Sequence, residues 1–269
     1  MGCIKKILII SIVCLITAAC TTVPISGRRQ LSLIPGDTIL SMSYQQYDKF
    51  LDQHELSDNQ ADTQMVRQVG KEIAQAVEAY QRRHGMREQL KNYDWEFNLV
   101  KDDAVNAWCM PGGKVVVYTG ILPVTRNKTG LAVVMGHEIA HAVANHGNER
   151  MSHALAFQFG GIALSEALKT KPAATQRLWM GAYGAGAQMG IILPYSRMHE
   201  KEADLLGLIF MAMAGYDPRQ AVDFWRRMAK KKKGKSPPEF LSTHPADDKR
   251  IANIRQMLPE AMKYYRKRQ

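Results

Sequence analysis

The motif HEIAH, at residues 137–141, is the feature that most constrains what this chain can fold into. On an α-helix, residues i and i+4 lie on one face about one turn apart, so His137 and His141 can bind a single metal ion. Glu138 would then lie where it can take a proton from water held by that metal. The motif stands within an apolar, helix-compatible run over residues 129–144. Because buried polar groups cost free energy unless they have partners, this frame favours a metal site over two exposed surface histidines.

A catalytic zinc site needs a third protein ligand and an open position for water. One common arrangement, HExxHxxGxxH, takes that ligand from the same motif, but here Ala144 and Gly147 stand where its glycine and third histidine belong. His146 lies nine residues after His137, which is about 180° around a helix, so we expect it to point away from the metal near the helix end. The third ligand must therefore come from elsewhere in the chain.

The charged segment SRMHEKEAD, at residues 196–204, holds the best candidate. Glu200 and Asp204 are again spaced i and i+4, so Glu200 could bind the metal while Asp204 accepts the free ring N–H of a ligand histidine. Glu202 lies about 200° from Glu200 and is expected to face solvent, paired with a nearby Lys or Arg. His199 has the chemistry of a rival ligand but sits about 100° off that face. The alternative is an ordinary charged amphipathic helix that holds no metal.

HExxH followed about sixty residues later by SRxxExEADxxG resembles peptidase family M48, a group of zinc metalloproteases. Two further stretches are similar to that family: NAWCMPGG at 106–113, continued by GIL at 120–122, and STHP at 242–245, with RI at 250–251. The resemblance covers roughly residues 60–257. It implies one zinc ion and these site residues: His137, His141 and Glu200 as ligands, Glu138 as catalytic base, and Asp204 as the partner of a ligand.

The N-terminus has the pattern of a bacterial signal peptide. Two lysines precede a mostly apolar stretch at residues 7–19, which is shorter than the ~20 residues that a membrane-spanning helix needs. The sequence TAAC, ending at Cys20, resembles a lipobox, and Thr21 in place of Asp is similar to lipoproteins sorted to the outer membrane. We therefore predict a signal peptide over residues 1–19, lipid on Cys20, and a place on the periplasmic face of the outer membrane. An ordinary secretory signal cleaved nearby is the alternative.

This N-terminus looks most like the short periplasmic lipoprotein members of the family, since the chain lacks the family's long membrane-spanning segments. The cysteines agree with it. Cys3 and Cys14 leave with the signal and Cys20 carries lipid, so only Cys109 remains and no intramolecular disulfide can form. Cys109 is expected to be a small buried apolar side chain and not a nucleophile.

The mature length of about 250 residues suits one large core or two small ones. We expect a tether over residues 20–36 and a metallopeptidase domain over 37–269. The predicted fold class is α+β, mainly α: a zincin-like domain with a small β-sheet beside the active-site helix. Turn and capping signals predict these elements: helices at about 37–53 and 58–83, strands at 94–101 and 114–118, and helices from Thr129 onward.

The edge of that sheet is the expected place for substrate. A strand edge beside the metal can bind an extended polypeptide by main-chain hydrogen bonds. Asn106 and Ala107, just before the turn at 111–113, are candidates for contacts with the substrate backbone. Capping of the turn by Asn106 is a nearly equal alternative. In the predicted reaction zinc lowers the pKa of water toward about 7, and Glu138 takes its proton.

Two other regions have weaker signals. Residues 154–194 hold two apolar runs, each too short for a comfortable membrane span, which we interpret as helices over the active site. Packing in the core is favoured for them over membrane contact. KKKKGK, at 230–235, predicts an exposed loop. The net charge of +11 favours a solvated charged face, or contact with anionic lipid headgroups, and no nucleic acid partner.

His244 precedes Pro245, which favours an extended backbone, and the family resemblance places this segment near the cleft. Three roles remain open. The imidazole could stabilise the oxyanion, occupy the open zinc position until the loop moves, or be a surface histidine beside a turn. We favour the second role, in which His244 is a plug, because a loop rich in Lys, Pro and Gly is a poor rigid platform for transition-state binding.

Two functions of different classes fit the sequence. The first is a zinc-dependent endopeptidase of the cell envelope, which hydrolyses peptide bonds in damaged or misassembled proteins. The second is a chaperone or assembly factor for outer-membrane proteins, with a mainly structural metal and a secondary or latent protease activity. The intact HExxH motif favours the first, because a purely structural zinc normally has four protein ligands and no need of Glu138.

Overall fold

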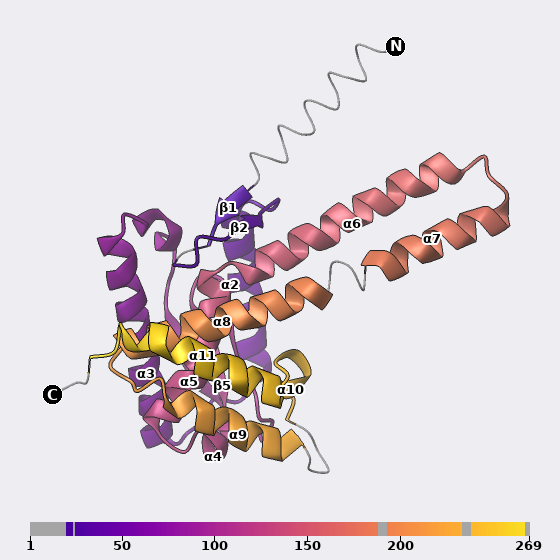
Figure 1. Cartoon of the computed structure of the whole chain (residues 1–269). Coiled ribbons are helices and arrows are strands. Elements are labelled where there is room, and N and C mark those ends of the chain that lie inside the picture. Colours follow the sequence, from indigo (N-terminus) through magenta and orange to yellow (C-terminus); the bar gives the residue numbers. More distant parts are fainter. Residues whose placement is uncertain (1–19, 24, 188–192, 233–237, 267–269) are drawn as a thin grey trace.

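The computed structural model describes residues 20–23, 25–187, 193–232 and 238–266; the predicted signal peptide lies outside them. Helices pack around a small sheet to form the body, and one long helical hairpin projects from it (Figure 1). The mainly helical α+β fold predicted from the sequence is confirmed. The helices of the body are α2 (Gly36–Gln53), α3 (Gln60–Arg83), α4 (Leu122–Thr125), α5 (Lys128–Val143), α8 (Leu193–Met213), α9 (Gln220–Lys232), α10 (Phe240–Thr243) and α11 (Asp248–Met262).

A three-stranded sheet lies beside α5. Its strands are β3 (Glu96–Val100), β4 (Ala107–Met110) and β5 (Lys114–Tyr118), in the order β3-β5-β4. β3 runs parallel to β5 and β4 runs antiparallel to it. β4 is therefore an edge strand, and it packs against α5, the helix that carries HEIAH. This places a strand edge next to the motif, as the sequence predicts.

Both faces of the sheet are covered, which explains the unbroken apolar run of β5. Val115 and Val117 belong to the main core with residues of α3 and α5. Val116 and Tyr118 point to the opposite face, where they pack against Tyr47 of α2. Successive side chains of a strand alternate between the two faces, so a strand buried on both sides needs apolar residues at nearly every position.

The crossing of α5 and α8 brings the two halves of the metal motif together. Every residue of α5 from Gly130 to Val143 is buried. At the crossing Gly136 faces Gly207, and a Cβ on Gly207 would lie 2.8 Å from the backbone nitrogen of His137. Two glycines thus allow the helices to approach at backbone distance. This close approach sets Glu200 of α8 over the histidines of α5.

We expect Gly207→Ala to destabilise the fold by about 1–3 kcal/mol, because the added methyl group must push α8 away from α5. Urea unfolding of the metal-free protein measures this change. The matched control is Gly181→Ala, also in a helix, where a Cβ would meet nothing within 4 Å. There the lower backbone entropy of alanine favours stability by roughly 0.5–1 kcal/mol. Equal effects of the two substitutions would contradict the close-packing argument.

The segment after the predicted lipidation site differs from the extended tether that the sequence predicts. It forms an antiparallel hairpin of β1 (Cys20–Thr22) and β2 (Arg29–Leu31). Val23, between the strands, is 1% exposed. The backbone N–H of Leu33 donates to the Ser152 hydroxyl over 2.9 Å. The hairpin packs against the body because it carries its own buried apolar side chain, which a Pro- and Gly-based expectation of a tether overlooked.

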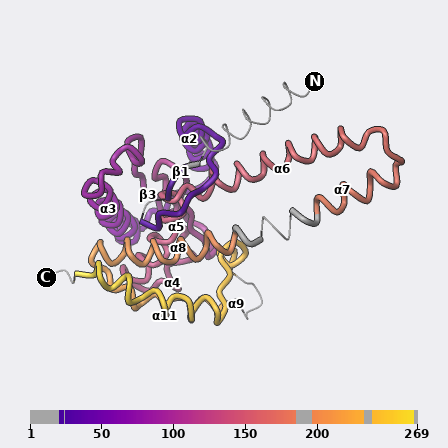
Figure 2. Tube along the Cα trace, turned by 45° about the horizontal axis from the view of Figure 1, so that its top comes forward, coloured from indigo at the N-terminus to yellow at the C-terminus, as the bar shows by residue number. Residues whose placement is uncertain are grey.

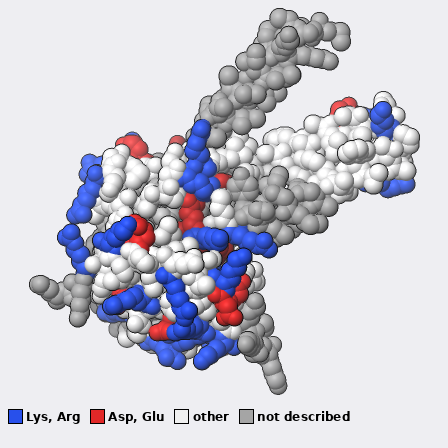
Figure 3. Space-filling model, in the orientation of Figure 1, with Lys and Arg blue, Asp and Glu red and all other residues white. Residues whose placement is uncertain are grey.

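The apolar runs within 154–194 form α6 (His146–Leu168) and α7 (Ala173–Ala187), which project away from the body as a hairpin (Figures 1 and 2). The expectation that they pack in the core over the active site is wrong. Phe159 is 65% exposed and Trp179 is 55% exposed. Figure 3 shows almost no charge along the hairpin, with basic and acidic side chains near its far end. Apolar composition predicted burial, but only the first turns of α6 pack against the body, and beyond them the hairpin leaves large apolar side chains exposed.

No helix among the described residues has both the length and the apolar character needed to cross a bilayer. The basic stretch at 230–235 also differs from the predicted loop in its first part. Lys230 and Lys231 are exposed and lie in α9, which ends at Lys232, while residues 233–237 lie outside the described part of the chain.

Candidate metal centre

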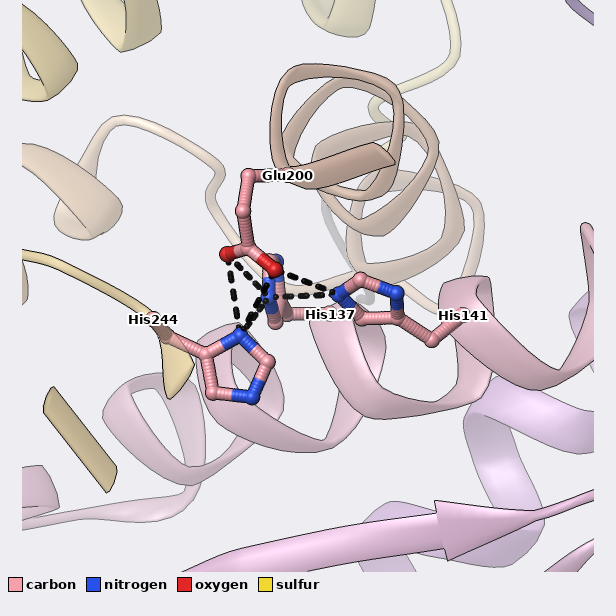
Figure 4. Close-up of side chains that lie close together, drawn as sticks. All are labelled: His137, His141, Glu200 and His244. Atoms are coloured by element: carbon pink, nitrogen blue, oxygen red, sulfur yellow. Dashed lines mark hydrogen bonds and ion pairs between the residues drawn. The ribbon is translucent and has the colours of Figure 1, made fainter. Parts of the chain in front are cut away.

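Four side chains from three separate segments converge on one point (Figure 4). His137 and His141 come from α5, Glu200 from α8, and His244 directly follows α10. Each offers one ligand atom, and these atoms all lie within 4.8 Å of one another. The Nε2 atoms of His137 and His141 are 3.1 Å apart. Glu200 Oε1 lies 3.2 Å from His141 Nε2. The structure thus brings together the three predicted ligands and adds His244 to them.

The arrangement of protons around these rings fits a cation. Nδ1 of His137 lies 3.1 Å from a carboxylate oxygen of Asp204, to which it can only donate. Nδ1 of His141 lies 2.8 Å from the ring of His146. With Nδ1 as the donor, the neutral form of each ring has an unprotonated Nε2, which is the form that binds a metal ion. Three imidazoles with one carboxylate are a donor set that suits zinc.

Asp204 orients His137 and is itself held by Arg250 of α11. The guanidinium donates to Asp204 over 2.6 and 2.9 Å. It also lies 3.5 Å from the centre of the Trp225 ring. A carboxylate behind a ligand histidine fixes its tautomer and raises its basicity. The sequence predicted this role for Asp204 but gave none to Arg250, although Arg250 stands in the RI stretch of the family resemblance.

The ionised carboxylate of Glu200 gives the site a negative charge that favours a cation. Burial raises the pKa of Glu200, but hydrogen bonds from His137, His141 and His244 outweigh it and hold that pKa far below its usual range. Burial lowers the pKa of His137, while hydrogen bonds to Asp204 and Glu200 raise it to about 9, so zinc binding must displace a proton from this ring. Burial also holds the pKa of His141 well below its usual value. Glu200 is therefore ionised near neutral pH and attracts a positive ion.

Glu138 faces this cluster as a base without a fixed partner. Its side chain is buried, and Oε1 has no hydrogen-bond partner among the described residues. The Nε2 of His244 lies 3.4 Å from this Oε1. Burial raises the pKa of Glu138, and the neighbouring His244 and His137 only partly oppose the rise. A raised pKa brings a carboxylate closer to the range in which it accepts and returns a proton during catalysis.

His146 and Glu202 are placed differently from the predictions. His146 is fully buried, and its Nδ1 lies 2.8 Å from Nδ1 of His141. The helical angle does not apply, because Asn145 adopts a left-handed conformation with φ 54° and the chain turns there into α6. Glu202 is 8% exposed and accepts from His146 Nε2 over 2.9 Å. It faces the β1–β2 hairpin, which covers what would otherwise be a solvent face of α8.

His199, the rival ligand, lies outside the cluster of donor atoms. Its Nε2 is 2.7 Å from a carboxylate oxygen of Glu149 in α6. Cys109 shows no sign of a nucleophile, because burial raises the pKa of its thiol well above the usual value. Neither side chain is thus placed to take part in hydrolysis.

His244 is buried, so the alternative of a surface histidine is wrong. Its Nδ1 lies 2.9 Å from Glu200 Oε2 and 3.1 Å from His137 Nε2. The backbone N–H of His244 donates to the carbonyl of Phe240 over 3.0 Å, and the Phe240 ring packs against the imidazole. The ring is therefore held by the short helix α10, and not by the Lys- and Pro-rich loop that the sequence prediction assumed.

The two predicted substrate contacts lie at the start of the edge strand β4. The side-chain carbonyl of Asn106 accepts from the backbone N–H of Ala107 over 2.9 Å. The carbonyl of Val105, next to them, accepts from the backbone N–H of Phe240 over 3.1 Å. Asn106 thus serves its own turn in this structure, and the predicted contact of Asn106 and Ala107 with substrate stays a prediction.

Two histidines one turn apart on a buried helix, a glutamate between them and a carboxylate ligand from a crossing helix define a zinc metallopeptidase. The sequence model of one such family agrees with the geometry. It is described as peptidase family M48, and it matches residues 60–258. The chain belongs to this family.

Curated relatives carry the same family relationship. The mitochondrial metalloendopeptidase OMA1 of Schizosaccharomyces pombe is 37% identical over 174 residues, which cover 64% of this chain and 49% of the relative. The human metalloendopeptidase OMA1 is 30% identical over 249 residues, covering 89% of this chain and 46% of the relative. The β-barrel assembly-enhancing protease of Escherichia coli is 31% identical over 182 residues, covering 60% of this chain and 34% of the relative. The chain thus spans about half or less of the length of these relatives.

Proposed function

We propose that the protein is a zinc-dependent endopeptidase of the cell envelope, which hydrolyses peptide bonds in damaged or misassembled proteins. The observation that carries this proposal is the placement of Glu138. Its carboxylate is buried beside a cluster of three imidazoles and one carboxylate, and its Oε1 has no hydrogen-bond partner among the described residues. A metal held only for structure has no use for such a group.

Each residue of the site has a separate role in the proposed hydrolysis. His137, His141 and Glu200 would hold zinc, which supplies Lewis acidity to the carbonyl under attack and to the attacking water. Glu138 accepts the proton of that water and returns it to the leaving amine. The free edge of β4 can align an extended polypeptide by main-chain hydrogen bonds, so that cleavage does not depend on one particular side chain. Such a site suits unfolded segments of many sequences.

The proposal predicts that an unfolded polypeptide is cleaved and that its folded form is spared, because a folded chain cannot lie extended along β4. Reduced and carboxymethylated α-lactalbumin, beside the native protein, provides the pair of substrates. Fragments are followed by mass spectrometry, with and without a zinc chelator. Cleavage of the native form at the same rate, or cleavage that persists without metal, would contradict the proposal.

Support for the cell envelope comes from the N-terminal sequence. The apolar stretch at 7–19 and the lipobox-like TAAC ending at Cys20 favour export and a lipid anchor on the periplasmic face of the outer membrane. Within the family, this N-terminal pattern favours the short periplasmic lipoprotein type. The relatives named β-barrel assembly-enhancing protease support a bacterial envelope role, and outer-membrane proteins are then candidate substrates.

We expect Cys20→Ala to leave an unprocessed precursor or a soluble protein, because alanine offers no thiol for lipid attachment. Detergent partitioning and intact mass of the purified protein measure the change. The matched control is Cys109→Ala, which removes a thiol from β4 and should leave the modification intact. Unchanged detergent partitioning of the Cys20 variant would contradict the lipoprotein proposal.

A second candidate function is that of a chaperone or assembly factor for outer-membrane proteins, with secondary or latent protease activity. The observation in its favour is the position of His244. Its Nδ1 lies with the ligand atoms of His137, His141 and Glu200, so the site offers four protein ligands. Four protein ligands are typical of structural zinc. The two functions differ in whether loss of the Glu138 carboxylate removes the biological activity or only the cleavage.

A further inference from the structure

A row of hydrogen-bonded polar side chains connects His141 to the β1–β2 hairpin. It lies on the side of the His141 ring that faces away from the other three candidate metal ligands. His141 Nδ1 lies 2.8 Å from His146 Nδ1. His146 Nε2 lies 2.9 Å from Glu202 Oε2. The Nε of Arg28 donates to that same oxygen over 2.9 Å. Arg28, which directly precedes β2, is thereby three hydrogen bonds away from a zinc ligand.

The carboxylate of Glu202 determines which atom is the donor in each of these hydrogen bonds. An ionised carboxylate only accepts, so His146 Nε2 must be the donor to Glu202. With Nε2 as the donor, the neutral ring of His146 has an unprotonated Nδ1. That nitrogen accepts the Nδ1–H of His141. The Nε2 of His141 is then left with its lone pair toward the donor cluster, which is the tautomer that a metal ligand needs.

Arg28 holds the carboxylate of Glu202 in place. Its guanidinium makes a bidentate pair with Glu149 over 2.7 and 2.8 Å, in addition to its bond with Glu202. Glu149 is 1% exposed and Glu202 is 8% exposed. Both carboxylates contact this one guanidinium, which fixes the position of the Glu202 carboxylate. Arg28 therefore holds the Glu202 carboxylate where it accepts from His146.

The other ligand histidine of α5 is supported in the same manner. Arg250 donates to Asp204, and Asp204 accepts from Nδ1 of His137. Each of the two imidazoles is thus connected by hydrogen bonds to a carboxylate that an arginine holds. For His137 the connection to the carboxylate is direct, and for His141 it passes through His146. Support of the carboxylate–histidine type commonly changes metal affinity by 10- to 100-fold when it is lost.

We infer that Arg28 is a positioning residue of the metal centre, which fixes the ring of His141 through Glu202 and His146. This inference rests on the zinc site proposed above. It extends the metal centre to the N-terminal hairpin, outside residues 60–258 that match the family. The hairpin is then part of the site's support, and a chain that begins after it has a weaker metal centre even if its helices are intact.

The test is zinc affinity of the full chain, measured by competition with a chromophoric chelator. We expect Arg28→Gln to weaken zinc binding about tenfold and His146→Phe to weaken it about 10- to 100-fold. The double variant should be no weaker than His146→Phe alone, because the path from Arg28 passes through His146. Arg29→Gln is the matched control: it removes the same charge from an exposed neighbour on the same hairpin and should leave affinity unchanged.

A merely structural Arg28 gives a different pattern. It would lower the stability of the metal-free protein to urea and leave zinc affinity at the wild-type value, or its effect would add to that of His146→Phe. Either result overturns the inference. If Arg28→Gln does not fold, Arg28→Gln/Glu149→Gln removes the buried charges as a pair and still deprives Glu202 of its guanidinium. Wild-type zinc affinity in that variant also overturns the inference.

The same measurements separate this inference from the proposed function. A wild-type chain that binds no zinc would refute the metal centre itself, whatever Arg28 does. A wild-type chain that binds zinc and cleaves unfolded protein, together with an Arg28→Gln variant of equal zinc affinity, would refute the role of Arg28 alone.

Discussion

Replacement of Glu138 by Gln is expected to lower the rate of peptide-bond cleavage by about 10²- to 10⁴-fold, with zinc and fold retained. Glutamine keeps the size of the side chain but cannot accept a proton. The carboxylate of Glu138 contacts no ligand strongly: its Oε1 lies 3.4 Å from His244 Nε2 and has no hydrogen-bond partner among the described residues. The substitution therefore removes the base and spares the atoms that hold zinc. Cleavage of a reduced, unfolded protein, with zinc content measured on the same sample, checks both halves of the expectation.

The control is Glu88→Gln, because the side chain of Glu88 is 83% exposed and far in sequence from the motif. It should cleave like the wild type. Zinc missing from the purified Glu138 variant would mean that this carboxylate has a structural role. Wild-type cleavage with zinc present would mean that another group is the base. If the protein acts mainly as an assembly factor, the Glu138 variant should still support outer-membrane protein assembly in cells.

The parts of this site that local sequence could predict are those set within a single helix. The apolar run over 129–144 predicted α5, whose observed bounds are Lys128–Val143. The i, i+4 spacing of Glu200 and Asp204 predicted that they share a face of one helix, and both face His137. Helical periodicity is a local property, so it can be read from neighbouring residues alone.

The parts that sequence could not predict depend on chain turns and on distant segments. His146 was expected to point away because its angle was continued past the end of α5, and the left-handed Asn145 invalidates that step. Glu202 was expected in solvent because nothing in its own helix shows that Arg28 lies over it. The α6–α7 hairpin was expected in the core because apolar composition predicts burial without naming what covers the surface. In each case the deciding contact joins residues that no local pattern relates.

The position of His244 bears on how the site is controlled. Its Nδ1 stands among the donor atoms, 2.9 Å from Glu200 Oε2. A zinc ion with four protein ligands is closed, whereas a catalytic zinc keeps one position for water and substrate. If His244 is the fourth ligand, it must move before hydrolysis can occur. The helix α10, which His244 directly follows, is short and spans Phe240–Thr243.

We accordingly expect His244→Ala to raise basal turnover, as predicted for a plug. If the closed form outnumbers the open form by about ten to one, its removal raises turnover about tenfold, since only the open fraction is competent. Zinc affinity should fall at the same time, because one of the four donor residues is lost. Steady-state cleavage of an unfolded substrate and chelator competition on the same samples provide the two measurements. Thr243→Ala, an exposed neighbour, is the matched control and should change neither.

The opposite role gives the opposite sign. If His244 stabilises the oxyanion, its loss removes transition-state binding worth roughly 3 kcal/mol, and turnover falls by about 10²-fold. Zinc affinity would then stay at the wild-type value, since an oxyanion donor touches substrate and not metal. Buried Phe240 packs against His244 and makes α10 a firmer platform than its neighbouring loop. This contact favours the oxyanion role. The place of Nδ1 within the donor cluster favours the plug more directly. Turnover and zinc affinity that both match the wild type would dismiss the two roles together.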